Sequence, residues 1–329
     1  MINMNKLLFF NTLVFSILMS ISSYSWFSMW MGLEINLLSI VPLMTSKLPL
    51  SSESSLKYFL TQAMASSLFL YSAVMMSLEI HSNFNMMMYI MNIALLIKMA
   101  AAPFHFWFPE IMEGLAWSPC LLLLTVQKLP PMMLLMTNLI SINFLTLIII
   151  SSMLIGGIMG LNHVSLRKIM TYSSINHIGW LLASLTLNSM IWLTYFIIYT
   201  TITLLMVMFF HEKNIFFINQ LFQNSKFSNM EKLMFAFNFM SLGGLPPFIG
   251  FYPKWIVINN MVSTHMILIS LAMVIVTLIT LYYYIRIMNF YMLMNTSEMS
   301  FSINTKLNKF FMMFMFLNIT GLMILMTMW

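Results

Sequence analysis

Hydrophobic runs of about 20 residues follow one another along almost the whole chain, and a helix of that length crosses the hydrocarbon core of a bilayer. Of the 329 residues, 61% are hydrophobic and 7% are charged, whereas a soluble domain carries about 25% charged residues. The sequence therefore predicts an all-α polytopic membrane protein. Eleven transmembrane helices are expected, at about 7–23, 26–44, 58–78, 86–108, 115–137, 143–161, 169–187, 190–210, 233–262, 266–285 and 310–328.

The basic residues support this count. Three of the 14 lysines and arginines lie inside hydrophobic runs, and with eleven spans the other eleven all fall on the side of the N-terminus. By the positive-inside rule, the N-terminus faces the cytoplasm-like compartment and the C-terminus faces away from it. The charges are thus topology signals, and no nucleic-acid partner is expected. These residues are Lys6, Lys47, Lys57, Arg167, Lys168, Lys213, Lys226, Lys232, Arg286, Lys306 and Lys309.

Two predicted spans contain prolines that interrupt a helix. The segment APFHFWFPE at 102–110 aligns without gaps with PPFIGFYPK at 246–254, so that Pro103 matches Pro247, which follows Pro246. The two segments lie five helices apart. An odd offset makes the second copy enter the membrane from the opposite face, as in many secondary transporters whose broken helices line an ion site.

This internal similarity predicts three parts of the chain. Residues 1–140 form a first five-helix repeat, and residues 141–290 form a second, inverted one, each with a proline-broken helix. Residues 291–329 add a loop and a C-terminal transmembrane helix.

Three lysines, Lys98, Lys128 and Lys254, lie inside the hydrophobic runs, and Glu34 lies near the middle of the second run. A charge in hydrocarbon costs several kcal/mol unless it is paired, hydrated or neutralised, so these four residues are functional candidates. A lysine that snorkels to the interface is the simpler alternative, but Lys98 lies about ten residues inside its run. Lys98 precedes the first proline break by about one turn and is the expected partner of Glu34.

These four groups suggest proton transfer. Movement of Glu34 toward or away from Lys98 would switch the lysine between holding and releasing a proton. A proton released there can load Lys128 and then Lys254, through waters near the breaks where backbone carbonyls are freed.

Three further residues are weaker candidates for a relay. His177 has polar neighbours inside the seventh run, and His105 lies beside the first break. For both, a hydrogen-bonded structural histidine is about equally plausible. Glu110 lies close to the basic face, where a solvated acid at a helix end is the simpler interpretation.

The sequence lacks the residues that a metal, cluster or nucleotide site would require. The single cysteine, Cys120, cannot hold an iron–sulfur cluster, and no histidine pair has metal spacing. No glycine-rich phosphate loop is present. The 40 methionines are spread from end to end and fit interchangeable packing better than a copper site. We therefore expect no metal and no cofactor in this chain.

Five long motifs are jointly specific: WMGLEIN at 30–36, KYFLTQA at 57–63, APFHFWFPE at 102–110, LRKIMTYSSINHIGW at 166–180 and LGGLPPFIGFYPKW at 242–255. They resemble the antiporter-like subunit 2 family of mitochondrial NADH:ubiquinone oxidoreductase, respiratory complex I.

The resemblance covers about residues 25–260 and implies a core membrane subunit that translocates protons. It assigns the proton-translocating axis to Glu34, Lys98, Lys128 and Lys254. Electron transfer from NADH to ubiquinone, with FMN and iron–sulfur clusters, would take place in other subunits.

The resemblance also implies a location and partners. The location is the mitochondrial inner membrane, with the N-terminus in the matrix and the C-terminus in the intermembrane space. The partners are other membrane-arm subunits, accessory subunits and lipids such as cardiolipin. Two alternatives remain: a stand-alone cation/proton antiporter, and a scaffold whose buried charges only hold helices together.

Overall fold

The computed structural model describes residues 4–46, 48–78, 84–138, 141–223, 229–293 and 321. Within these residues the chain is helical, and the only strand-like feature is one isolated bridge between Ser165 and Phe217. The chain forms two compact units, 1–145 and 146–329.

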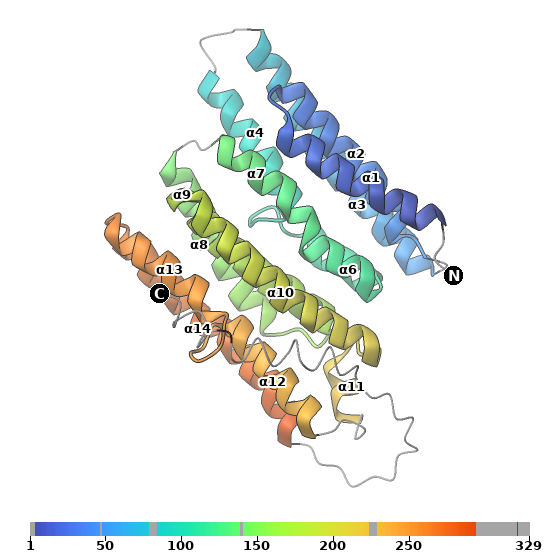
Figure 1. Ribbon diagram of the computed structural model, residues 1–329, viewed down its shortest axis with the longest axis vertical. Helices are drawn as coiled ribbons and strands as arrows, with labels where there is room; N and C mark the ends of the chain where they lie inside the picture. The colour runs from blue at the N-terminus through green and yellow to red at the C-terminus, as the bar shows by residue number, and fades with distance from the viewer. Residues whose placement is uncertain are drawn as a thin grey trace. The chain divides into compact units, whose positions relative to one another are not determined.

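The first unit is a bundle in which α2 packs against both α1 and α3, while α4 packs against α3 and α7 (Figure 1). Its elements are α1 (Met4–Ser22), α2 (Trp26–Met44), α3 (Pro49–Ser77), α4 (Phe84–Met99), α5 (Trp107–Gly114), α6 (Trp117–Leu124), the 3₁₀ turn η2 (Val126–Lys128) and α7 (Leu129–Thr137).

The second unit surrounds α9, whose residues from Ile169 to Leu185 are all buried. Such a helix, enclosed on every side, lies in the core of its unit, where it contacts α10, α13 and α14. The elements are α8 (Ile142–Gly160), α9 (Leu166–Leu187), α10 (Ser189–Lys213), α11 (Ile218–Gln223), α12 (Asn229–Gly243), α13 (Phe251–Ser263) and α14 (Ile267–Leu293).

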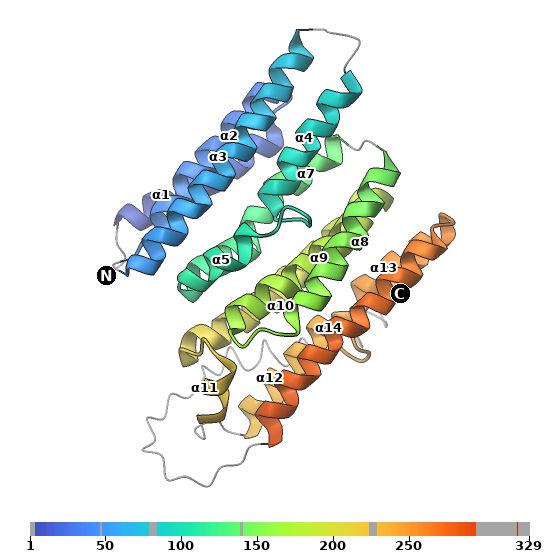
Figure 2. The ribbon, with the colours of Figure 1, turned by 180° about the vertical axis from the view of Figure 1, so that it is seen from behind.

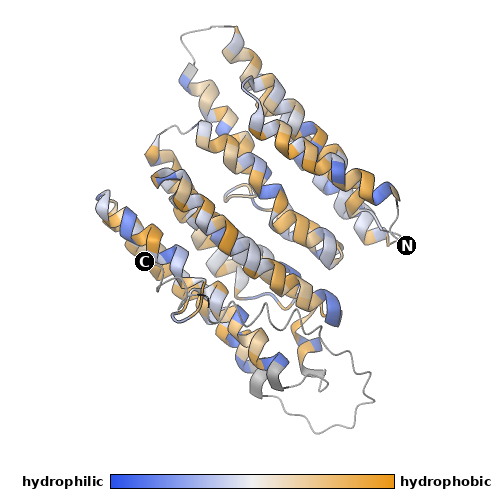
Figure 3. Ribbon diagram, in the orientation of Figure 1, coloured by the Kyte–Doolittle hydropathy of each residue, from blue (hydrophilic) through white to orange (hydrophobic). Residues whose placement is uncertain are grey.

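Seven helical segments among the described residues, counting α6 to α7 as one, are long and apolar enough to cross a membrane, and they coincide with seven of the predicted spans. Their residues are mostly hydrophobic (Figure 3), and many large apolar side chains on them are exposed, such as Leu268, which is 84% exposed. Large exposed apolar surfaces of this kind need a hydrophobic solvent. The chain is therefore a polytopic membrane protein, as predicted, and its described part is helical.

The other four predicted spans do not correspond to any of these seven segments. The spans at 86–108 and 233–262 are each divided into two helices. The span at 169–187 corresponds to α9, which is continuous but rich in polar residues. The span at 310–328 lies outside the described residues except for position 321, as do Lys47, Lys226, Lys306 and Lys309.

The first break, between α4 and α5, lies where the prolines predicted it. Its residues fold back on the end of α4, because the Trp107 indole N–H donates to the Ile97 carbonyl (3.2 Å) and Ala101 N–H donates to the Leu96 carbonyl (3.1 Å). The α5 helix therefore starts close to the end of α4 (Figure 2). The Ala102–Pro103 peptide bond within the break is cis.

The second break, between α12 and α13, is closed by a glycine. Gly244 has φ +77°, a left-handed conformation that favours glycine and commonly ends helices. Its N–H and that of Leu245 both donate to the Met240 carbonyl, at 3.0 and 3.3 Å. Pro246 and Pro247, joined by a cis bond, follow directly and cannot continue the helix.

A third interruption was not predicted. The span at 115–137 was expected to be one regular helix, but it changes to a 3₁₀ turn at Val126–Lys128 between α6 and α7. Pro130 and Pro131 lack the N–H groups that would bond the carbonyls four residues earlier, so an α-helical ladder cannot pass through this point. Lys128 consequently lies at a helix interruption.

A buried ion pair joins α10 to α12 in the second unit. Lys213 Nζ lies 3.2 Å from Glu231 Oε1, and the two side chains are 6% and 8% exposed. Glu231 lies in the first turn of α12 and Lys213 in the last turn of α10, where the helix dipoles favour these charges. This pair fixes the two helix ends to each other.

Gly32 allows α1 and α2 to approach closely. A Cβ added at Gly32 would lie 2.8 Å from Ser20 N and 2.9 Å from Ser20 Cα, which are backbone atoms that cannot rotate away. We expect Gly32→Ala to lower the stability of the assembled protein by about 1–3 kcal/mol, as measured by its thermal inactivation midpoint. Gly157→Ala is the matched control, because its Cβ would meet Val276 at an ordinary 3.4 Å. Equal midpoints for both variants would contradict this packing.

Candidate functional site

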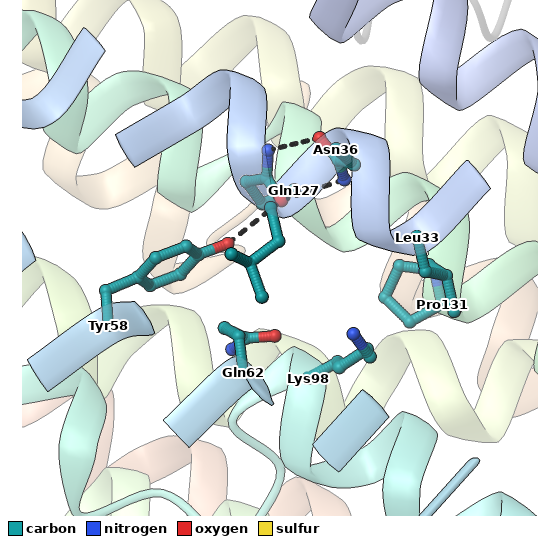
Figure 4. A pocket seen from close by; sticks show the side chains of 8 residues that line it. Leu33, Asn36, Tyr58, Gln62, Lys98, Gln127 and Pro131 are labelled. Atoms are coloured by element: carbon teal, nitrogen blue, oxygen red, sulfur yellow. Dashed lines mark hydrogen bonds between the residues drawn. The ribbon is translucent and has the colours of Figure 1, made fainter. Parts of the chain in front are cut away.

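The first unit contains a small polar cavity beside Lys98 (Figure 4). Its volume is about 10 Å³, which is close to the least that holds one water molecule. The lining contributes an ammonium group, three amide or hydroxyl groups from α2 and α3, and one amide from the 3₁₀ turn. The lining residues are Leu33, Asn36, Leu37, Tyr58, Gln62, Lys98, Gln127 and Pro131.

A reciprocal amide pair forms one wall of this cavity. Asn36 Nδ2 donates to Gln127 Oε1 at 3.0 Å, and Gln127 Nε2 donates to Asn36 Oδ1 at 2.9 Å. The Tyr58 hydroxyl also donates to Gln127 Oε1, at 3.2 Å. The three side chains are buried. The pair therefore joins α2, two residues after Glu34, to the turn that carries Lys128.

The Gln62 amide and the Lys98 ammonium face the same space (Figure 4). Lys98 is 8% exposed, and Gln62 Nε2 is buried without a hydrogen-bond partner in the described part of the chain. A buried polar group normally has a partner, protein or water. A single water molecule in this cavity would bond both side chains.

Glu34 is half-buried on α2. No direct ion pair joins its carboxylate to Lys98 among the described residues. A coulombic interaction depends on distance, so a movement of α2 would change the influence of the Glu34 charge on Lys98. The role of Glu34 as a switch stays a prediction.

Lys128 is 2% exposed and lies at the end of the 3₁₀ turn. Its Nζ is 5.9 Å from the centroid of the Phe108 ring on α5, a distance at which the ring face attracts a cation. The turn thus places Gln127 and Lys128 side by side, with Gln127 in the Lys98 cavity.

The amide pair gives a testable energy. Asn36→Leu and Gln127→Leu each leave the partner amide buried without the two bonds that join the pair, and we expect each to cost about 0.6–2 kcal/mol of stability. The double variant should cost less than the sum of the singles, because it leaves neither amide unpaired. Thermal inactivation of the assembled protein measures all three. Ser39→Ala, which removes a hydroxyl bonded within its own helix, is the control, and strictly additive costs would contradict the coupling.

The second unit holds Lys254, 5% exposed, in the first turn of α13. Its Nζ donates to the Gly243 carbonyl at 2.7 Å and to the Leu242 carbonyl at 3.3 Å. The last carbonyls of a helix lack intrahelical donors and carry partial negative charge. The carbonyls at the end of α12 therefore bind the Lys254 ammonium group.

Gly244 leaves room for this lysine. A Cβ at Gly244 would lie 2.7 Å from Lys254 Cδ and 2.9 Å from its Nζ. Gly244 thus ends α12 and also begins the break before α13. A larger residue at this position would displace the Lys254 side chain.

Aromatic rings lead from Lys254 to His177. The Lys254 Nζ lies 5.8 Å from the Trp180 ring centroid, and Trp180 stacks on Tyr195 at 6.5 Å. The Tyr195 hydroxyl and His177 Nδ1 are hydrogen-bonded at 2.9 Å. Tyr199 packs 5.0 Å from the histidine ring. His177 is thus connected to the Lys254 site by contacts of α9 and α10.

The remaining candidates lie elsewhere in the first unit. His105 is buried in the break after α4, with Nδ1 at 3.2 Å from the Pro103 carbonyl. Glu110 is on the surface, where Lys57 Nζ lies 3.2 Å from its carboxylate and also pairs with Glu53. A relay role for either residue stays a prediction.

Sequence reasoning did not identify Asn36, Tyr58, Gln62 and Gln127. Their signal is an uncharged polar side chain inside a hydrophobic run, which also occurs where helices simply pack together. Within the described residues, no group of three potential metal-ligating side chains is present.

Known proteins with similar sequences show the family of this chain. The profile of the NADH:quinone oxidoreductase/Mrp antiporter transmembrane family matches residues 23–280, and the chain belongs to this family. It is 45% identical to NADH-ubiquinone oxidoreductase chain 2 of Anopheles gambiae over 97% of this chain and 96% of the relative. It is 41% identical to the chain of the same name from Locusta migratoria, over 93% and 91%. The resemblance inferred from the five motifs is thus confirmed.

Solved structures agree in fold. The chain is similar to a chain of respiratory complex I from Thermus thermophilus, with TM-score 0.85 and 21% identity over 99% of this chain and 78% of the other. It is also similar to a chain of the Mrp complex from a Dietzia species, with TM-score 0.74 and 18% identity over 84% and 59%. At these identities the similarity shows the fold alone.

Proposed function

We propose that the chain is the antiporter-like membrane subunit 2 of complex I and that its buried lysines pass protons. One observation carries the proposal: Lys98, Lys128 and Lys254 are each more than nine-tenths buried, and each lies at a helix interruption. Buried ammonium groups at irregular backbone mark ion pathways in membrane proteins. Family membership supplies the reaction class, which is NADH–ubiquinone oxidoreduction coupled to proton translocation.

The cavity beside Lys98 suggests how the first transfer occurs. A water molecule in this cavity would accept a proton from the ammonium, because Lys98 and Gln62 both line the same small space. The Asn36–Gln127 pair holds the turn next to that water, and Lys128 follows Gln127 directly. A shift of α2 moves Glu34 and Asn36 together, so the charge near Lys98 and the position of the turn change at the same time.

The full topology belongs to this proposal. It comprises eleven spans, with inverted repeats over 1–140 and 141–290 followed by a C-terminal part over 291–329. Two features support it: the broken helices lie at the aligned segments, and each broken helix carries one of the buried lysines. The lysine precedes the break in the first repeat and follows it in the second.

The setting follows from the proposed identity. The protein lies in the mitochondrial inner membrane with its N-terminus in the matrix and its C-terminus in the intermembrane space. Other membrane-arm subunits, accessory subunits and lipids such as cardiolipin are its partners. FMN, iron–sulfur clusters and ubiquinone serve the complex in other subunits.

The rival function is cation/proton antiport, since the fold is shared with a chain of the Mrp complex. Membrane vesicles that contain the intact complex distinguish the two. We expect proton movement when NADH and quinone are supplied, and none when only a sodium or potassium gradient is imposed. Proton counterflow driven by the cation gradient alone, and lost in Glu34→Gln, would favour the antiporter instead.

A further inference from the structure

The first turn of α5 lies between the surroundings of Lys98 and those of Lys128. It begins directly after the first break, with Trp107 and Phe108. Trp107 Nε1 donates to the carbonyl of Ile97, the residue before Lys98, at 3.2 Å. The centroid of the Phe108 ring lies 5.9 Å from Lys128 Nζ. Two consecutive residues of α5 thus reach the surroundings of two buried lysines.

The Trp107 ring also contacts the tyrosine of the cavity beside Lys98. Tyr58 and Trp107 pack edge to face, with ring centroids 5.9 Å apart and an angle of 64° between the rings, an arrangement that aromatic pairs favour. The Tyr58 hydroxyl in turn donates to Gln127 Oε1 at 3.2 Å (Figure 4). Because Gln127 directly precedes Lys128, a second connection runs from the indole through Tyr58 to the turn that carries Lys128.

The indole N–H bonds a carbonyl that the helix itself leaves open. Ile97 lies in the last turn of α4, where the carbonyls have no intrahelical donor. Its oxygen accepts two bonds, from the Trp107 indole at 3.2 Å and from Ala100 N–H at 3.1 Å. The bond from Ala100 lies within the break itself, whereas the bond from Trp107 joins the end of α4 to the start of α5.

A second contact between α3 and α5 lies nearby, at the surface. Lys57 Nζ is 3.2 Å from Glu110 Oε2, and the two side chains are 45% and 62% exposed. Ion pairs at this exposure contribute little to stability. The buried Tyr58 ring and the indole bond are therefore the contacts that hold the first turn of α5 in place.

We propose that Trp107 is a positioning residue for proton transfer, which fixes the Lys98 end of α4 relative to the turn that carries Lys128. The inference rests on the proposed function, because it requires these two lysines to take part in the relay. A displacement at the end of α4 moves Trp107, and with it Phe108 and Tyr58, so the surroundings of both lysines change together. Proton transfer requires groups held within hydrogen-bond reach, and the indole bond narrows the positions that Lys98 can take.

Trp107→Phe in the intact complex tests the proposal, since phenylalanine keeps an aromatic ring and removes the N–H. We expect coupled NADH–quinone turnover per assembled complex to fall about fivefold, as for the loss of one hydrogen bond. Trp192→Phe is the matched control. Trp192 also stacks on a ring, that of Phe196 at 5.3 Å, but its Nε1 has no hydrogen-bond partner in the described part of the chain. Its turnover should stay at the wild-type value.

Two further measurements separate positioning from lost packing. The pH at which turnover is half-maximal should move by about half a unit in Trp107→Phe and stay constant in Trp192→Phe. In a Lys98→Met background, Trp107→Phe should cause no further loss of turnover, because the residue acts through that lysine. A purely structural tryptophan would leave the pH dependence unchanged, and its effect would multiply with that of Lys98→Met.

Equal turnover and equal pH dependence in Trp107→Phe and Trp192→Phe would overturn the proposal, provided that Lys98→Met still lowers turnover. Unchanged turnover in Lys98→Met would instead contradict the proposed function itself. If Trp107→Phe does not assemble, Tyr58→Phe decides, because it keeps the ring against Trp107 and removes the bond to Gln127. The same shift in pH dependence is expected for this variant, and a wild-type pH dependence would contradict the connection.

Discussion

Replacing Lys98 with methionine is expected to lower the coupled NADH–quinone turnover of the assembled complex by at least about tenfold. A positioned group that accepts and gives a proton typically contributes about 10²-fold or more to a rate. Methionine has a similar length and no charge, so the substitution removes the proton carrier without a costly group in the hydrocarbon. Turnover in coupled vesicles, normalised to the amount of assembled complex, measures the effect.

The control for this variant is Lys6→Met, which removes the same charge from an exposed position on α1. It should leave turnover unchanged. If Lys98→Met also keeps the wild-type turnover with normal assembly, Lys98 has no part in the coupled reaction, and its burial has only a structural meaning.

Gly244→Ala is expected to lower coupled turnover as much as Lys254→Met does. The added Cβ would overlap the end of the Lys254 side chain and push its ammonium away from the carbonyls at the end of α12. The left-handed backbone adds a cost of about 1–2 kcal/mol for a residue other than glycine. Both substitutions take the ammonium group away from the carbonyls at the end of α12. The double variant should therefore be no slower than either single variant. Turnover of the three assembled variants tests this.

A neighbouring glycine provides the control. A Cβ at Gly243 would meet Leu281 and Tyr284 at an ordinary 3.6 Å, so Gly243→Ala should keep turnover near the wild-type value. Losses from Gly244→Ala and Lys254→Met that multiply in the double variant would show that the glycine acts through something other than the lysine.

The sequence was sufficient for the membrane class, for seven spans and for the two proline breaks. Hydrocarbon excludes unpaired backbone groups, so a run of about 20 apolar residues has few alternatives to a helix. The interruption at Val126–Lys128 was missed. The proline pair follows Lys128 directly, and whether prolines kink a helix, start a new one or force a 3₁₀ turn depends on neighbouring helices that the sequence pattern does not reveal.

The candidate site divides in the same way. The sequence identifies Lys98, Lys128, Lys254 and Glu34, because a charged residue inside a hydrophobic run is costly and therefore rare. The Asn36–Gln127 pair is not visible, because its members lie 91 positions apart and each alone is an ordinary polar residue of a helix. The backbone carbonyls that bind Lys254 cannot be recognised in the sequence, because every residue has a backbone carbonyl.

The number of protons moved per NADH oxidised tests the relay most directly. It is measured in proteoliposomes of the intact complex that carry Glu34→Gln, a variant of the same shape without the charge. If the half-buried Glu34 and the buried lysines pass protons, this ratio falls below the wild-type value while the complex still assembles. An unchanged ratio at full turnover would contradict the relay and leave these residues the role of holding helices together.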